Sequence, residues 1–193
     1  MSRLSSYLPL LWAVVVLFTD FFSKRIVLAH AESLQQKVEV IGDLLRFAYV
    51  RNAGAAMGLF PVGRTALIVI SLVATGFLVA LFLRTSTSNV LRRSAIAAIL
   101  GGALGNLVDR IFYDGLVVDF IDIGIGTHRF YTFNVADMGV TLGGLVLFIS
   151  LLKETQQQDG VVTTVSSATE SSHEETVNIR TNENESAESG ADP

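Results

Sequence analysis

The sequence predicts a mainly α-helical, polytopic membrane protein with four transmembrane helices and a small extracytoplasmic β-sheet at the membrane surface. Half of its residues are hydrophobic and only 17% are charged, whereas a soluble domain carries about 25% charged residues. The apolar residues gather into four long runs within residues 1–154. Because a segment inside a bilayer must satisfy its own backbone hydrogen bonds, these runs are expected to be helices.

The four runs have lengths suited to crossing a bilayer, which takes about 20 helical residues. The run at residues 65–83 contains 19 residues without a charge. The other runs contain ionisable residues and lie at about residues 7–28, 94–112 and 133–152. Four spans place both termini on one side, and the basic residues Arg84, Arg92 and Arg93 favour the cytoplasm for that side. Four basic residues in the opposite loop leave the charge count itself undecided.

Two segments outside the runs have the pattern of short β-strands. In residues 45–52 (LRFAYVRN), the large side chains of Leu45, Phe47 and Tyr49 alternate with those of Arg46, Ala48 and Val50. Residues 117–125 (VVDFIDIGI) are rich in β-branched residues. We expect both to belong to a small sheet at the membrane surface, because the first loop is too long to be a simple connection. An irregular surface loop remains the alternative.

The charges divide the chain into two parts. Residues 1–154 have ten acidic and thirteen basic residues and carry +3, whereas residues 155–193 have eight acidic residues and one Arg and carry −7. We expect residues 1–154 to be one membrane domain and residues 155–193 to be a disordered, acidic, cytoplasmic tail. The absence of cysteine excludes disulfides and thiolate metal sites. No basic stripe indicates a nucleic-acid partner.

Four acidic residues lie near the same face of the predicted membrane domain. Ionisable side chains are costly inside a membrane, so each is a candidate for function. They are Asp20, Asp109, Asp119 and Asp137. Two carboxylates held close together share one proton, and such a pair can activate water and protonate a carbonyl, as in aspartic proteases. Alternatively, these acids only neutralise nearby Lys and Arg residues.

The spacing of polar residues along the helices bears on both interpretations of the acids, catalysis and charge neutralisation. Asp20 and Lys24 are four residues apart on one helix face, so we expect them to neutralise each other. Asn106 with Asp109, and Asn134 with Asp137, are three residues apart, so each amide can orient its neighbouring carboxylate.

Two other classes of protein also place Asp and Asn in membrane helices. A small proton-coupled transporter would use acids near the middle of the bilayer and would commonly show an internal repeat. Here the acids lie near one edge, and the two halves share no pattern. A membrane scaffold without enzymatic activity would tolerate Asp to Asn changes.

Five blocks of the sequence resemble those of the lipoprotein signal peptidases, the type II signal peptidases of bacteria. In order, they are TDFFSK at 19–24, RNAGAAMG at 51–58, GGALGNLVDR at 101–110, VVDFID at 117–122 and FNVAD at 133–137. The resemblance covers about residues 7–153. It implies an aspartyl endopeptidase of the bacterial inner membrane, expected to be a monomer, with both termini in the cytoplasm and its active site near the extracytoplasmic face. Its implied substrates are diacylglyceryl-modified prolipoproteins, cleaved before the lipidated cysteine, and it needs neither metal nor cofactor.

The resemblance also assigns roles to single residues. It implies that Asp119 and Asp137 are the catalytic pair, with Asp109 as the alternative to Asp119. The implied supporting or substrate-binding residues are Asn52, Gly54, Asn106, Asp109, Arg110, Asn134, Asp20 and Lys24. Met57 and Tyr131 depart from the family pattern, which commonly has Phe and Pro there, and both concern the lip of the site.

Overall fold

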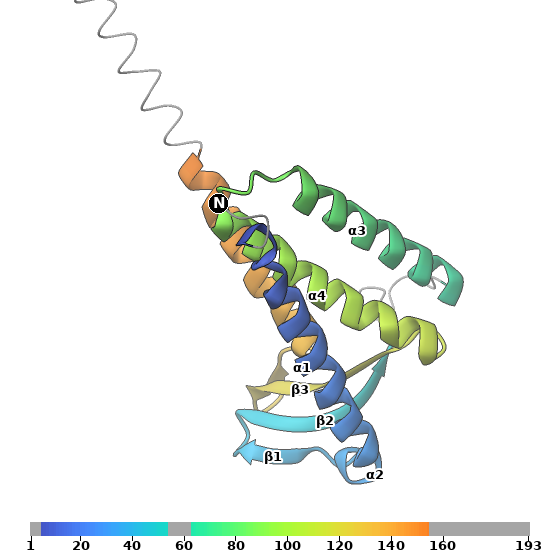
Figure 1. Ribbon diagram of the computed structural model, residues 1–193. Coiled ribbons are helices and arrows are strands. Elements are labelled where there is room, and N and C mark those ends of the chain that lie inside the picture. Colours follow the sequence, from blue (N-terminus) through green and yellow to red (C-terminus); the bar gives the residue numbers. More distant parts are fainter. Residues whose placement is uncertain (1–4, 54–62, 155–193) are drawn as a thin grey trace, which may run out of the picture. The chain divides into compact units, whose positions relative to one another are not determined.

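The computed structural model describes residues 5–53 and 63–154 (Figure 1). Its helices and strands follow the order in which the sequence patterns occur. The helical elements are η1 (Ser5–Tyr7), α1 (Leu10–Ala29), α2 (Ala31–Leu34), α3 (Arg64–Arg84), α4 (Val90–Phe112) and an unlabelled last helix, Val135–Glu154. The strands are β1 (Val38–Ile41), β2 (Leu45–Asn52), β3 (Val117–Ile125) and β4 (His128–Arg129). The chain divides into two compact units, residues 1–148 and 149–193. The predicted tail, residues 155–193, lies outside the described part of the chain.

Within the described residues, three helices are long and apolar enough to cross a membrane: α3, α4 and the last helix. Three of the four predicted spans are therefore helices of the expected length and apolar composition. Helix α4 begins at Val90, four residues earlier than the predicted start at residue 94. Helix α1 has 20 residues and covers most of the first predicted span. It contains three charged residues, Asp20, Lys24 and Arg25, within its 20 residues, and it is not among the three helices that are long and apolar enough to cross a membrane.

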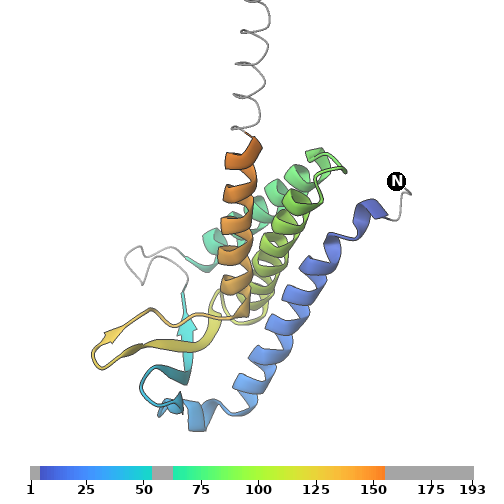
Figure 2. The same ribbon diagram turned by 90° about the vertical axis from the view of Figure 1, so that its left-hand side faces the viewer.

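Helix α4 packs against α1 on one side and α3 on the other (Figures 1 and 2). Glycines allow these close contacts. A Cβ atom at Gly101 would lie 2.5 Å from the carbonyl oxygen of Ala13 in α1, and one at Gly105 would lie 2.5 Å from a carboxylate oxygen of Asp20. The small residues of α4 thus bring its polar end against the acidic residue of α1, as small residues do at helix interfaces in membranes.

The four strands form one antiparallel sheet in the order β1-β2-β3-β4. Strands β2 and β3 have the bounds that their sequence patterns predict, residues 45–52 and 117–125. Strands β1 and β4 were not predicted, because each is at most four residues long. The sheet lies beside the end of α1 that leads into α2 (Figure 1). Since β3 starts soon after α4 ends, the sheet and the ends of the helices meet around the predicted acids.

Candidate active site

The last helix begins with a reciprocal cap that fixes Asp137. Asn134 precedes the first helical residue, and its Oδ1 accepts a hydrogen bond from the Asp137 backbone N–H at 2.9 Å. In return, Asp137 Oδ2 accepts one from the Asn134 backbone N–H at 3.2 Å. This is the geometry of a capping box, with an acid at the third helical position. The Asp137 carboxyl therefore lies at the N-terminal, positive end of the helix dipole.

Asn106 of α4 holds the other oxygen of the same carboxylate. Its Nδ2 donates to Asp137 Oδ1 at 2.9 Å. Its own Oδ1 accepts from Asn134 Nδ2 at 3.2 Å and from Lys24 Nζ at 3.0 Å. Both Asp137 oxygens are therefore held by donors, one from the helix cap and one from the neighbouring helix.

Asp119 reaches the same site from β3 and is almost completely buried, with 1% of its surface exposed. Asn134 Nδ2 donates to its Oδ1 at 2.6 Å, and Asn52 Nδ2 of β2 donates to its Oδ2 at 2.9 Å. Burial raises the pKa of Asp119 to about 6, and the negative charge of Asp137 acts in the same direction. The amide hydrogen bonds from Asn52 and Asn134 limit this rise. Asp119 thus keeps a proton to higher pH than an ordinary carboxyl.

Asp119 and Asp137 line one open pocket of about 250 Å³. The remaining lining comes from β2, β3, α4, the last helix and the segment before it: Asn52, Asn106, Arg110, Val117, Tyr131, Thr132, Val140 and Thr141. The structure therefore brings together the predicted residues Asn52, Arg110 and Asn106 around the two acids. A carboxyl pair in which one group has a raised pKa can activate water and donate a proton.

Asp109 and Asp20 lie beside this pocket and do not line it. Lys24 Nζ lies 2.7 Å from Asp20 Oδ2 and 2.9 Å from Asp109 Oδ2, with all three side chains buried. The predicted neutralisation of Asp20 by Lys24 is confirmed. Asp109 Oδ2 also accepts the Val118 backbone N–H at 3.0 Å, so it anchors the start of β3. The geometry places Asp119, and not Asp109, in the pocket with Asp137.

Gly54 lies outside the described residues, as does Met57. Among the residues that the structure describes, no three His, Cys, Asp or Glu side chains are arranged to hold a metal ion.

Several pocket residues were not singled out from the sequence. Thr141 lies four residues after Asp137 on the same helix, so helical spacing could have identified it. Thr132 and Val117 reach the pocket through the turn before the last helix and the start of β3. No sequence signal marks those two positions.

Known proteins are similar to this chain in sequence. The family model of signal peptidase II matches residues 12–153. A lipoprotein signal peptidase of Staphylococcus haemolyticus is 34% identical over 152 residues, which cover 79% of this chain and 95% of the relative. That of Staphylococcus aureus is 36% identical over 149 residues, covering 77% and 90%.

The fold is also similar to that of a solved bacterial membrane enzyme. Its 2.3 Å structure aligns with a TM-score of 0.69 and 36% identity, over 77% of this chain and 90% of that one. The family that the sequence blocks suggested is thereby confirmed. The chain belongs to the signal peptidase II family, a family of membrane aspartic peptidases.

Proposed function

We propose that this protein removes the signal peptide from diacylglyceryl-modified prolipoproteins by water attack between Asp119 and Asp137, cutting before the lipidated cysteine. The observation that carries the proposal is the shared pocket, in which two differently held carboxyl groups face one space. The relatives named as lipoprotein signal peptidases support the substrate class. The order and spacing of the five sequence blocks support it as well.

The two carboxyl groups have different roles in the proposed mechanism. Asp137 is the base, because the helix dipole and donors to both oxygens stabilise its anion. It takes a proton from the attacking water, while Asp119 donates its proton to the oxygen of the scissile carbonyl. The tetrahedral diol then collapses: the C–N bond breaks, the leaving nitrogen takes a proton from Asp137, and Asp119 recovers its own.

Other polar residues of the pocket hold the substrate or the acids. Asn106 and Asn134 orient the carboxyl groups through the hydrogen bonds described above. Arg110 and Asn52 line the pocket from opposite elements, α4 and β2, and can bind backbone carbonyls of the substrate. On the basis of the family pattern, we assign Gly54 the role of a point of close approach.

A second pocket suits the lipid part of the substrate. It has a volume of about 250 Å³ and shares Tyr131, Thr141 and Asp137 with the first pocket. The rest of its lining is apolar: Phe130, Phe133, Met138 and Leu142. An acyl chain attached to the cysteine can lie against this surface while the peptide bond reaches the two acids.

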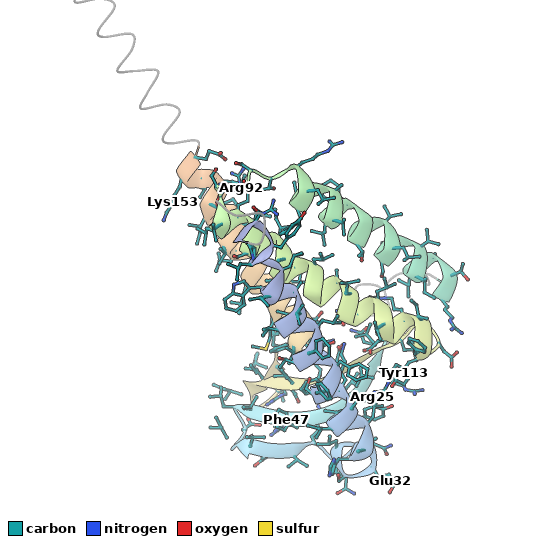
Figure 3. The ribbon with its side chains drawn as sticks, in the orientation of Figure 1. Arg25, Glu32, Phe47, Arg92, Tyr113 and Lys153 are labelled. Carbon is teal, nitrogen blue, oxygen red and sulfur yellow. The ribbon has the colours of Figure 1, made fainter. Side chains whose placement is uncertain are left out.

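We propose that α1 crosses the membrane together with α3, α4 and the last helix. The charges of Asp20 and Lys24 do not prevent this, because they are buried and paired at 2.7 Å. Arg92 and Tyr113 mark opposite ends of α4 (Figure 3), and the sheet lies near the Tyr113 end. With Arg84, Arg92 and Arg93 at the cytoplasmic end, the two acids lie near the extracytoplasmic face of the inner membrane.

The proposal also covers the organisation of the chain. Residues 1–154 are the peptidase domain and act as a monomer, and residues 155–193 are a cytoplasmic acidic tail without a part in the chemistry. Truncation after Glu154 tests this assignment. A shortened protein that inserts normally but loses most of its turnover would contradict it.

The decisive experiment compares two substrates. The purified protein is incubated with a diacylglyceryl-modified prolipoprotein and with its unlipidated form, and mass spectrometry identifies the new N-terminus. We expect cleavage before the cysteine of the lipidated form only, and no cleavage by the Asp137→Asn variant. Equal cleavage of both forms would contradict the lipid requirement.

A further inference from the structure

We propose that Lys24 is a positioning residue for this reaction: its buried ammonium group fixes the orientation of the Asn106 amide and thereby the hydrogen bond that Asn106 donates to Asp137. This inference rests on the proposed role of Asp137. It gives Lys24 a task beyond the neutralisation of nearby acids.

Each N–H of the Lys24 ammonium has one acceptor inside the protein. Two are carboxylate oxygens, Asp20 Oδ2 at 2.7 Å and Asp109 Oδ2 at 2.9 Å. The third is an amide oxygen, Asn106 Oδ1 at 3.0 Å. The residue is 3% exposed, so water does not compete for these donors. The two carboxylates are sufficient to neutralise Lys24 and to link α1 with α4. The third contact is with Asn106, which lines the pocket.

The chemistry of the ammonium decides how the Asn106 amide must lie. An ammonium group only donates hydrogen bonds, whereas an Asn side chain has an accepting oxygen on one side and a donating NH₂ on the other. The oxygen therefore faces Lys24, and the NH₂ faces Asp137 Oδ1 at 2.9 Å. The reverse orientation would place NH₂ against an ammonium and an oxygen against a carboxylate, so both contacts would become repulsive.

The same network reaches the second acid. Asn106 Oδ1 also accepts from Asn134 Nδ2, which donates to Asp119 Oδ1 as well. Asn134 is fully buried, so its amide has no alternative partner in water. Lys24 thus stands at the head of a hydrogen-bond chain that aligns both carboxyl groups, although it contacts neither of them.

The first test is a double-mutant cycle between Lys24 and Asn106. Lys24→Met keeps the side-chain length and removes the ammonium. We expect kcat to fall by about 10- to 100-fold, because misaligned catalytic groups lose rate to this extent. KM should stay within about threefold, since Lys24 does not line the pocket. In an Asn106→Ala background, the same substitution should lower kcat no further. An equal fold-loss in both backgrounds would overturn the inference.

A second background guards against misfolding, because Lys24→Met leaves Asp20 and Asp109 without a cation. Should that variant fail to insert, Lys24→Met is combined with Asp109→Asn and compared with Asp109→Asn alone. Detergent-solubilised yield and Tm report folding of each variant. The inference expects the same loss of kcat in this pair. Equal kcat in the two proteins would contradict it.

The pH profile separates alignment from mere support of the fold. The charged groups around the two acids are Asp20 and Lys24 from α1 and Asp109 and Arg110 from α4. The charge of Lys24 lowers the pKa of Asp119, so its removal should shift the alkaline limb of kcat/KM to higher pH. An unshifted limb would contradict the inference. Failure of the wild-type protein to cleave the lipidated substrate would instead contradict the proposed function.

Discussion

Two aspartates of β3, Asp119 and Asp122, are both almost inaccessible to solvent, but their pKa values are shifted in opposite directions. Their exposed fractions are 1% and 2%. Burial and the neighbouring Asp137 raise the pKa of Asp119 to about 6. Burial also acts to raise the pKa of Asp122, but Arg129 at 2.7 Å and Lys37 at 3.3 Å hold it below its ordinary value. Burial alone therefore does not decide whether a carboxyl keeps its proton.

The partners of the two acids explain the difference. Asp119 is held by the neutral amides of Asn52 and Asn134, which orient it without cancelling the cost of its buried charge. Asp122 is held by two cations, Arg129 of β4 and Lys37 just before β1, which both favour its anion. The two neutral amides leave the pKa of Asp119 raised, whereas the two cations bring the pKa of Asp122 below its ordinary value.

The largest expected effect is on turnover. Asp119→Asn and Asp137→Asn should each lower kcat by at least about 10³-fold, because each removes a proton-transfer group. Both variants should still insert and bind lipidated substrate. Cleavage assays at saturating substrate measure the loss, with Asp122→Asn as the matched control on the same strand.

Asp122→Asn should retain its kcat in protein that remains folded, because Asp122 does not line the pocket. Near-normal turnover in either Asp119→Asn or Asp137→Asn would exclude this pair. Loss of turnover confined to Asp109→Asn and Asp137→Asn would show that Asp109, and not Asp119, pairs with Asp137.

The second expected effect is on stability, and it has opposite signs for the two residues. The pKa of Asp119 is raised on folding from 3.8 to about 6, so ionising it above pH 6 opposes folding by roughly 3 kcal/mol. Asp119→Asn should therefore raise Tm at pH 7.5 and leave it unchanged near pH 4. Asp122→Asn should lower Tm at pH 7.5, because Arg129 and Lys37 lose their anion.

The pH dependence of the Asp122 effect provides the check. Its pKa is lowered on folding, so its contribution is present above the unfolded value and is lost as the pH falls through the folded one. The difference in Tm between wild type and Asp122→Asn should shrink below about pH 4. Thermal unfolding in detergent at several pH values measures both series, and shifts of the same sign at pH 7.5 would contradict the comparison.

The third expected effect concerns the amide partner of Asp119. Asn52→Ala removes a hydrogen bond that lowers the pKa of Asp119. The alkaline limb of kcat/KM, expected near pH 6 in the wild type, should move to higher pH. The value of kcat/KM at its optimum should fall by about 10-fold, the worth of one hydrogen bond to a charged group. A limb that moves to lower pH would show that Asn52 does not act on Asp119.

The smallest expected effect is on substrate binding at Tyr131, on the border of the two pockets. Tyr131 borders both pockets, and its ring contacts that of Phe130 in a tilted arrangement with ring centroids 4.1 Å apart. Tyr131→Ala should raise KM for the lipidated substrate by about 3- to 10-fold with kcat almost unchanged, because it removes apolar surface and no catalytic group. Ile125→Ala is the matched control, since Ile125 is an exposed apolar residue of β3 that lines neither pocket. Equal changes in KM would argue against a lip role.

The sequence alone determined the features that depend on neighbours along the chain. Apolar runs predicted the helices, and alternation predicted β2 and β3 with their observed bounds. The spacing of Asn134 and Asp137 indicated a local contact, which the structure forms as a capping box through two backbone N–H groups. The spacing of Asp20 and Lys24 likewise indicated their ion pair. These contacts span three or four residues, so the helical repeat determines them. The predicted amide partners were wrong: the side-chain NH₂ of Asn134 donates to Asp119 and that of Asn106 donates to Asp137.

Only the tertiary structure decided which acids share the pocket. Asn52 and Asp119 are 67 positions apart, and Asp20 and the Ala136 backbone N–H that it accepts are 116 positions apart. The sequence favoured Asp119 but left Asp109 as its rival, because each belongs to a characteristic block near the same membrane face. Close packing of α4 on α1 turns Asp109 toward Lys24, and the register of β3 with β2 turns Asp119 toward Asn52. Helix packing and strand register are properties of the assembled chain, so no local pattern could distinguish the two acids.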